Sequence, residues 1–352
     1  MTQRGQGTAA DIAEQPGGFA RLLDTEHTGL IAEVAAEVAR RRPRNVVFVA
    51  RGTSDHAALY GAYLSEIRLG LPVASASPSA ITLFGARPDF TGSLVVGVSQ
   101  SGGSPDLTGV LQVARETGGL TLAVTNNPES PLARAAELSI DVAAGHERAV
   151  AATKTYTAEL LALLLLVEGI RAGDGALPAE ERAALDKLPQ LAEDALADRT
   201  ADDLAQRYRF ASRMVTTGRG YAYPTAREAA LKLMETSYLP ALAFSGADLL
   251  HGPLAMTDPD VPVLAVVGDG PGGQSMRDVV TRLGERRADV VTIGATDVPG
   301  AAGRLSVPAV TDERYSALLD ILPLQKLALS LALARGEDPD APRGLKKVTS
   351  TL

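Results

Sequence analysis

Short apolar runs alternate with longer stretches of mixed polarity along most of the chain. Residues 45–50 and 94–98 are nearly continuous apolar runs rich in β-branched side chains, and each leads into a loop with glycine or serine. Such runs are typical of strands buried on both faces of a sheet. The stretches that follow, at about 55–68 and 105–117, are predicted to be helices. Strands that alternate with helices indicate an α/β fold with a parallel sheet covered on both faces.

The second half of the chain repeats this pattern. Gly52 and Gly220 stand 168 positions apart, as do Gly102 and Gly270, and each pair follows matching apolar runs. One offset that serves several predicted strands indicates an internal duplication. We therefore predict an N-terminal helical segment, two α/β subdomains and a C-terminal tail, over residues 1–43, 44–190, 205–335 and 336–352.

Composition and charge narrow the function classes. The formal net charge is −8, and the run Arg40-Arg41-Arg42 closes a predicted helix, where cations suit the negative end of the helix dipole. The sequence therefore does not favour a nucleic-acid partner. The most apolar run, 160–167, is eight residues long and flanked by Glu159 and Glu168, which indicates a buried helix rather than a membrane span.

The chain has no cysteine, which excludes disulfides, cysteine–zinc sites and a thiol nucleophile. Its first residues show no apolar segment typical of a signal peptide. We therefore expect a cytoplasmic protein. Acidic and histidine residues do not cluster at ligand spacing, so no metal site and no cofactor are predicted.

Two hydroxyl-rich loops of the first copy are candidate anion sites. Gly52-Thr53-Ser54 follows the first predicted strand, and the second loop runs from Ser99 to Ser104. Ligands of open parallel sheets bind beyond the carboxyl ends of the strands, and helix N-termini favour anions. No P-loop lysine follows either loop. A simpler interpretation is that these Ser and Thr residues only cap two helices.

The second copy differs at the matching loop. It has Val267-Gly268-Asp269-Gly270 where the first copy has Ser99-Gln100-Ser101-Gly102. An aspartate there would repel phosphate. We therefore expect one phosphate site per chain, on the first copy.

Candidate catalytic groups lie in the second half. Lys232 and Glu235 stand three apart on a predicted helix, so they share a face. They form either a helix-surface ion pair or part of a pocket wall, where a partly buried carboxylate beside a lysine would suit proton transfer. His251 lies in a loop, where imidazole can exchange protons or can be structural. Lys347 is near the C-terminus, where a lysine is commonly solvated.

These residues fall in motifs that resemble the sugar isomerase (SIS) superfamily, specifically the isomerase half of glucosamine-6-phosphate synthase and the SIS-type glucosamine-6-phosphate deaminases. The resemblance covers the chain from about residue 44 to its end and implies two tandem SIS subdomains, each a flavodoxin-like parallel sheet flanked by helices. The matching segments are Gly52-Thr53-Ser54, Val98-Ser99-Gln100-Ser101-Gly102, Leu122-Ala123-Val124-Thr125-Asn126, Ala152-Thr153-Lys154, Ala230-Leu231-Lys232-Leu233-Met234-Glu235, His251-Gly252-Pro253-Leu254-Ala255 and Pro342-Arg343-Gly344-Leu345-Lys346-Lys347.

The resemblance also implies roles for single residues. Glu235 matches the carrier of the proton between C1 and C2 of the sugar. His251 matches the ring-opening histidine, which the family takes from the neighbouring subunit of a dimer. Lys347, or Lys346 if the register slips by one, matches the lysine that forms a Schiff base with the keto-sugar under a closing tail. The implied contacts to the sugar 6-phosphate are Ser54, Ser99, Gln100, Ser101 and Ser104, with Thr53 nearby.

The chain departs from the family in ways that leave the reaction open. It shows no glutaminase domain, so we do not expect glutamine to supply ammonia, and Leu250 precedes the histidine where Lys or Arg is usual. The expected activity is isomerisation and deamination of glucosamine 6-phosphate to fructose 6-phosphate. One alternative is a dehydratase or lyase acting on N-acetylglucosamine 6-phosphate, with loss of the 3-hydroxyl. Another is a sugar-phosphate sensor without catalysis.

Overall fold

The computed structural model describes residues 4–347, which divide into two compact units. Within these residues, the amino-terminal unit comprises residues 17–147, 154–188 and 346–347. The carboxy-terminal unit comprises residues 4–16, 148–153 and 189–345. Each unit is built around one five-stranded sheet in which all paired strands are parallel.

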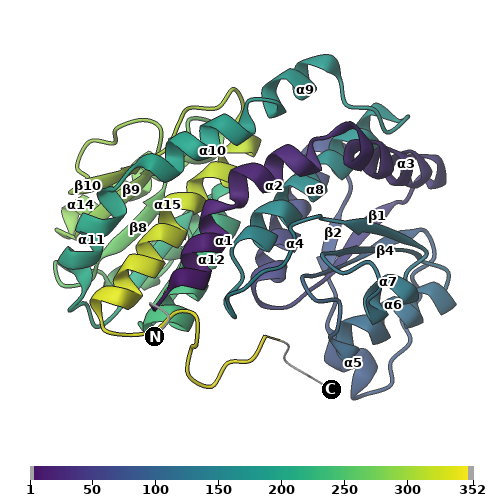
Figure 1. The fold of residues 1–352 in the computed structure, drawn as a ribbon, viewed down its shortest axis with the longest axis horizontal. Coiled ribbons are helices and arrows are strands. Elements are labelled where there is room, and N and C mark those ends of the chain that lie inside the picture. Colours follow the sequence, from purple (N-terminus) through teal and green to yellow (C-terminus); the bar gives the residue numbers. More distant parts are fainter. Residues whose placement is uncertain (1–3, 348–352) are drawn as a thin grey trace. The chain divides into compact units, whose positions relative to one another are not determined.

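The amino-terminal sheet has the strand order β2-β1-β3-β4-β5. This is the flavodoxin-like order, in which the chain first moves one way from β1 and then crosses back. Helices α3, α4 and α8 cover one face, and α5, α6 and α7 cover the other (Figure 1). The strands are β1 (Asn45–Val49), β2 (Val73–Ser75), β3 (Ser93–Ser99), β4 (Leu120–Thr125) and β5 (Leu138–Asp141). The helices are α3 (Thr25–Arg41), α4 (Gly52–Leu64), the π-helix η1 (Ser65–Leu69), α5 (Pro78–Thr82), α6 (Pro105–Glu116), α7 (Pro131–Ala135), α8 (Lys154–Ala172) and α9 (Ala179–Leu185).

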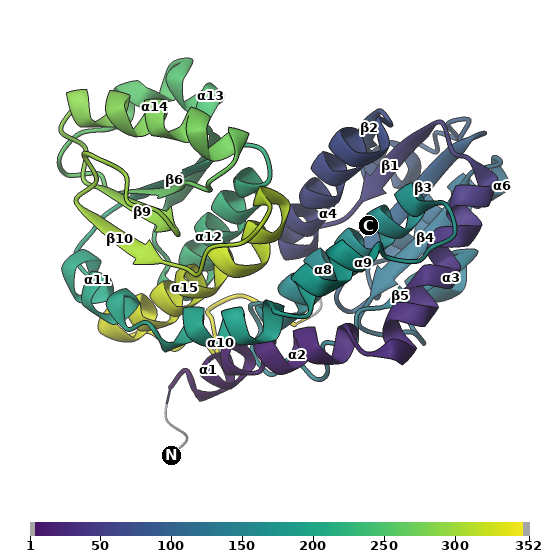
Figure 2. The same ribbon diagram turned by 90° about the horizontal axis from the view of Figure 1, so that it is seen from above.

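The carboxy-terminal sheet has the matching order β7-β6-β8-β9-β10. Helices α11, α12 and α15 cover one face, and α13 and α14 cover the other (Figure 2). The strands are β6 (Met214–Gly218), β7 (Ala241–Ser245), β8 (Val263–Val266), β9 (Val290–Gly294) and β10 (Gly303–Ser306). The helices are α10 (Leu188–Ala197), α11 (Thr200–Tyr208), α12 (Ala222–Ser237), α13 (Gly246–Leu250), the 3-10 helix η2 (Pro253–Met256), α14 (Pro271–Glu285) and α15 (Glu313–Ala334).

The duplication predicted from the sequence extends to the backbone. Gly52 and Gly220, which follow equivalent strands, have φ angles of 55° and 59°, in the left-handed region that favours glycine. Val73 and Ala241, the first residues of β2 and β7, are also 168 positions apart. The fold class is therefore confirmed: two tandem α/β subdomains, each with a parallel sheet flanked by helices.

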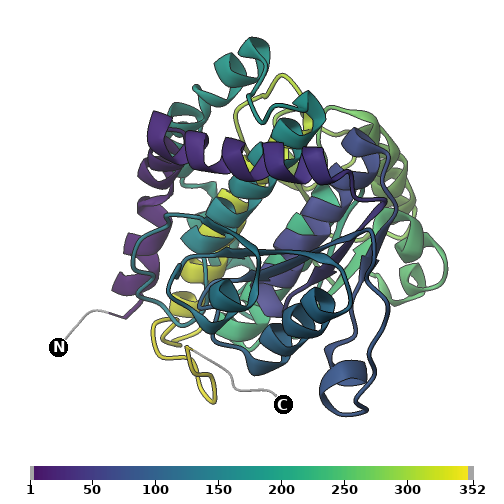
Figure 3. The same cartoon turned by 90° about the vertical axis from the view of Figure 1, so that its right-hand side faces the viewer.

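The segment before β1 is helical, and its described residues appear as consecutive purple helices in Figure 3. In addition to α3, the polar start forms α1 (Gln6–Ala13) and α2 (Gln15–Leu22). The N-terminus of α1 is capped from the far end of the chain, because Asp340 accepts the N–H groups of Gly7 (2.9 Å) and Thr8 (2.7 Å). A cap more than 300 residues away leaves no local signal.

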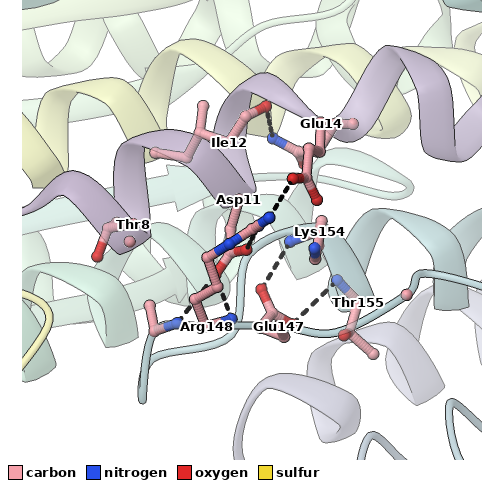
Figure 4. A network of polar contacts seen from close by, with 12 residues as sticks. Thr8, Asp11, Ile12, Glu14, Glu147, Arg148, Lys154 and Thr155 are labelled. Atoms are coloured by element: carbon pink, nitrogen blue, oxygen red, sulfur yellow. Dashed lines mark hydrogen bonds and ion pairs between the residues drawn. The ribbon is translucent and has the colours of Figure 1, made fainter.

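Two acidic networks fix the segment before α8 (Figure 4). In the amino-terminal unit, the Glu147 carboxylate accepts the N–H groups of Lys154 (3.0 Å) and Thr155 (3.2 Å). This cap explains why α8 begins at Lys154. In the carboxy-terminal unit, the Arg148 guanidinium contacts Asp11 (2.9 Å) and Glu14 (2.6 Å).

Two long apolar helices form the centres of the units. The predicted buried run 160–167 lies within α8, which is buried from Lys154 to Gly169. Among residues 4–347, α15 is the one helix long and apolar enough to cross a membrane, but 72% of its most apolar window is buried inside the fold. That degree of burial is typical of a core helix.

Candidate functional site

The six predicted phosphate contacts come from two neighbouring loops of the amino-terminal unit. Strands β1 and β3 pair directly, with Val49 opposite Gly97, so the loops at their carboxyl ends are adjacent. These loops carry Thr53, Ser54, Ser99, Gln100, Ser101 and Ser104. Ser54 is buried in the first turn of α4 and donates its hydroxyl hydrogen to Glu159 on α8 (2.8 Å), so it fixes the start of α4 to α8.

The loop from Ser99 to Ser104 is folded by its own hydroxyl groups. Ser99 Oγ accepts the N–H of Gly102, and Ser101 Oγ accepts the N–H of Gly103, both at 3.2 Å. Gly102 has φ 61°, and a Cβ there would lie 2.1 Å from Ser130 Oγ. Only glycine fits this turn, and it brings the backbone to the start of α6.

Helix capping does not explain these hydroxyl groups. The N-cap of α4 is Arg51 and that of α6 is Ser104, and neither side chain makes a capping hydrogen bond. The partly exposed side chains of Gln100, Ser101 and Ser104 therefore lie at a helix N-terminus without serving as its cap. Helix N-termini of this kind favour anions.

In the second copy, the chain's own carboxylate occupies the equivalent position. The Glu313 side chain accepts the N–H of Gly272 (3.0 Å) and that of Gly273 (2.7 Å) at the start of α14. A Cβ on Gly270 would lie 2.4 Å from Glu313 Oε2, so these glycines enclose the carboxylate closely. An internal anion therefore fills the second helix N-terminus.

Lys232 and Glu235 form an ion pair on the last turns of α12. Lys232 Nζ lies 2.6 Å from Glu235 Oε2 and 3.3 Å from Glu228 Oε1. The side chains of Lys232 and Glu228 are buried, whereas that of Glu235 is 23% exposed. The pair is therefore not a helix-surface ion pair. It is a buried cation between two carboxylates, of which only Glu235 reaches the surface.

The charge state of Lys232 follows from this arrangement. Burial alone would lower the pKa of the Lys232 ammonium, but the carboxylates of Glu228 and Glu235 raise it above its ordinary value. Lys232 therefore stays cationic at neutral pH. This fixed positive charge lies 2.6 Å from Glu235 Oε2 and restrains the position of that carboxylate.

The fold places His251 away from Glu235 within one chain. His251 is exposed and follows α13, on the face of the sheet that α14 also covers. Glu235 lies near the C-terminus of α12, on the opposite face (Figure 2). The five-stranded sheet therefore lies between α12, which carries Glu235, and α13, which His251 follows.

The C-terminal tail is attached to the end of the Glu235 helix. Tyr238 ends α12 in a left-handed conformation, and its hydroxyl accepts the N–H of Arg343 (2.7 Å). The Arg343 guanidinium also stacks over the Tyr238 ring, 3.9 Å from its centre. Of the two candidate lysines, Lys346 is exposed and Lys347 is partly buried. Residues 348–352 of the predicted tail lie outside the described residues.

Sequence reasoning missed three charged residues of this region. Glu228 carried a signal, since it precedes Lys232 by four positions and shares its helix face. Glu159 and Arg51 carried none, because their partners Ser54 and Asp106 are 105 and 55 positions away.

The chain matches known proteins over most of its length. Residues 41–169 and 208–335 match the model of the SIS domain. The chain belongs to the SIS-domain family. Each of the two matched segments contains its own complete parallel sheet, which agrees with the duplication.

Relatives of this SIS-domain chain include enzymes with longer sequences. It is 35% identical to a glutamine–fructose-6-phosphate aminotransferase (isomerizing) of Gloeobacter violaceus over 96% of its length, and it spans 57% of that relative. A provisionally assigned phosphosugar isomerase from Silicibacter pomeroyi is 33% identical, with TM-score 0.85 and coverage of 95% of this chain and 99% of that chain. The C-terminal domain of a glucosamine-fructose-6-phosphate aminotransferase from Francisella tularensis is 25% identical, with TM-score 0.85 and coverage of 96% and 98%.

Proposed function

We propose that this chain is a sugar-phosphate isomerase that acts on an amino-sugar 6-phosphate and converts glucosamine 6-phosphate into fructose 6-phosphate and ammonia. The observation that carries the proposal is the Glu235 carboxylate. Its side chain is 23% exposed, and the buried Lys232 ammonium lies 2.6 Å from it. The names of the three relatives support the class of substrate, since each contains a phosphosugar or fructose 6-phosphate.

The chemistry assigned to Glu235 is a proton shuttle. After the sugar ring opens, the carboxylate removes the proton from C2 and returns it to C1, while a second proton passes from the amine nitrogen to O1. The C1 aldehyde and C2 amine thereby become a C1 alcohol and a C2 imine. Water then adds to the imine carbon, and the nitrogen leaves as ammonia. The hydroxyl-rich loop between Ser99 and Ser104 holds the 6-phosphate during both steps.

The position of His251 supports a shared active site. Since α12 and α13 cover opposite faces of one sheet, the proposal takes the ring-opening histidine from a second copy. We therefore assign His251 to the neighbouring subunit's site in a homodimer. The tail is attached at Tyr238 through Arg343, and we assign Lys347 as the Schiff-base candidate.

The test of this function is direct analysis of products. Purified protein is incubated separately with glucosamine 6-phosphate and with N-acetylglucosamine 6-phosphate, and the products are examined by mass spectrometry. We expect ammonia and a hexose phosphate from the first substrate and no change in the second. Loss of water from the N-acetylated sugar would instead indicate the dehydratase, and binding without product would indicate the sensor.

Replacement of Ser99 and Ser101 together by alanine is expected to weaken binding of glucosamine 6-phosphate by about 10- to 100-fold, because hydrogen bonds to a charged group are lost. The measurement is isothermal titration calorimetry. A matched control replaces Ser75 and Ser139, which are exposed on the edge strands β2 and β5 of the same unit. Equal affinity of the two double variants would contradict the assignment of the loop.

A further inference from the structure

Arg51 lies where the two anion loops of the amino-terminal unit meet. It directly precedes Gly52, at the N-cap of α4, and its guanidinium reaches Asp106 in the first turn of α6. Arg51 Nε and Nη2 lie 3.1 Å and 2.9 Å from Asp106 Oδ2. This ion pair connects the helix starts that carry Thr53 and Ser104.

The two partners differ in exposure. The Asp106 carboxylate is 2% exposed and also accepts the N–H of Leu107 (2.9 Å), whereas the Arg51 side chain is 51% exposed. A buried carboxylate two positions after Ser104 would repel a phosphate bound to the loop. Arg51 balances that charge. Its contacts to Asp106 use Nε and Nη2, which leaves the Nη1 hydrogens for a second anion.

We propose that Arg51 is a phosphate-binding residue of this site, and that Asp106 positions it. The proposal rests on the function proposed above. A guanidinium presents a planar set of donors, so it can hold Asp106 along one edge and a substrate phosphate oxygen along another. Arg51 then supplies the positive charge that serine hydroxyls lack, and it selects a dianionic phosphate over an uncharged hydroxyl group.

A simpler role for Arg51 is to neutralise Asp106, and the two roles make different predictions. If Arg51 only compensates the buried carboxylate, its removal has no effect once Asp106 is uncharged. If Arg51 contacts phosphate, its removal weakens binding in either background. The decisive comparison is therefore Asp106→Asn against the double variant Arg51→Ala with Asp106→Asn.

The experiment measures the affinity of each variant for glucosamine 6-phosphate and for inorganic phosphate by calorimetry. We expect the double variant to bind both ligands about 10- to 100-fold more weakly than Asp106→Asn alone. Arg51→Lys is expected to bind more tightly than Arg51→Ala, because lysine restores the positive charge but not the planar set of donors of the guanidinium. The matched control is Arg87→Ala, which removes an exposed arginine paired with Glu116 at the end of α6.

The outcomes separate this inference from the proposed function. Equal affinity of Asp106→Asn and the double variant for both ligands would overturn the role of Arg51. Suppose that the double variant binds inorganic phosphate more weakly than Asp106→Asn, but the unmodified protein does not convert glucosamine 6-phosphate. The proposed function then fails and the Arg51 inference stands. If the unmodified protein binds neither ligand, both fail.

Discussion

Replacement of Glu235 by glutamine is expected to reduce kcat for glucosamine 6-phosphate by about 1,000-fold or more while the affinity for the substrate stays within a few-fold of the unmodified value. Glutamine keeps the shape of the side chain but cannot accept the C2 proton, and a positioned general base contributes about 100- to 10,000-fold to such reactions. Lys232 keeps a carboxylate partner in this variant, since Glu228 lies 3.3 Å away. The measurement combines steady-state kinetics with calorimetric binding.

The control for this variant is Glu285→Gln. Glu285 is the last residue of α14 and pairs with Arg282 three positions earlier, the same spacing as Glu235 and Lys232, but both partners are exposed. Glu285→Gln is expected to leave kcat unchanged. Turnover by Glu235→Gln at the rate of Glu285→Gln would show that the C2 proton goes elsewhere.

The central strands of both sheets could be predicted from the sequence because they are buried on both faces. β3 and β9, for example, consist entirely of buried residues and are nearly continuous in apolar side chains. The strands that the pattern missed are β2, β5, β7 and β10, which are the outermost strands of the two sheets. Most of their residues are at least partly exposed, so their sequences are mixed in polarity.

In the candidate site, what could be predicted depends on how far apart the interacting residues are in the sequence. The loops at Ser99 and the pair Lys232–Glu235 could be found because their partners lie within a few positions in the sequence. The pairing of Arg51 with Asp106 and the capture of Gly272 and Gly273 by Glu313 depend on the tertiary fold. The sequence comparison of the two copies selected the loop at Ser99 as the candidate phosphate site. The physical reason, an internal carboxylate at the second helix N-terminus, required the structure.

Asp320, on α15, is a buried carboxyl group without a hydrogen-bond partner. Its side chain is fully buried and neither oxygen has a partner, since the nearby Ser316 hydroxyl donates to the Glu313 carbonyl instead (2.8 Å). Burial raises the pKa of Asp320 to about 8, and the negative charges of Glu313 and Asp269 add to this shift. The folded protein therefore holds Asp320 as a neutral acid at neutral pH.

This state links stability to pH. In the unfolded chain an aspartate has a pKa near 3.8, so between about pH 4 and pH 8 the folded protein binds one more proton than the unfolded chain. The free energy of unfolding then falls as pH rises through this window, by up to about 1.4 kcal/mol per pH unit, and the loss is complete above the folded pKa. The protonated carboxyl group thus contributes its full stability only at the acidic end.

Asp320→Asn is therefore expected to raise the stability of the protein increasingly from pH 5 to pH 8, by about 3 kcal/mol or more at the upper end, because asparagine stays neutral at every pH. The measurement is chemical or thermal unfolding across this range. The control is Asp278→Asn, which changes an exposed aspartate within α14. A constant difference between Asp320→Asn and the unmodified protein at all pH values would mean that Asp320 is already ionised in the fold.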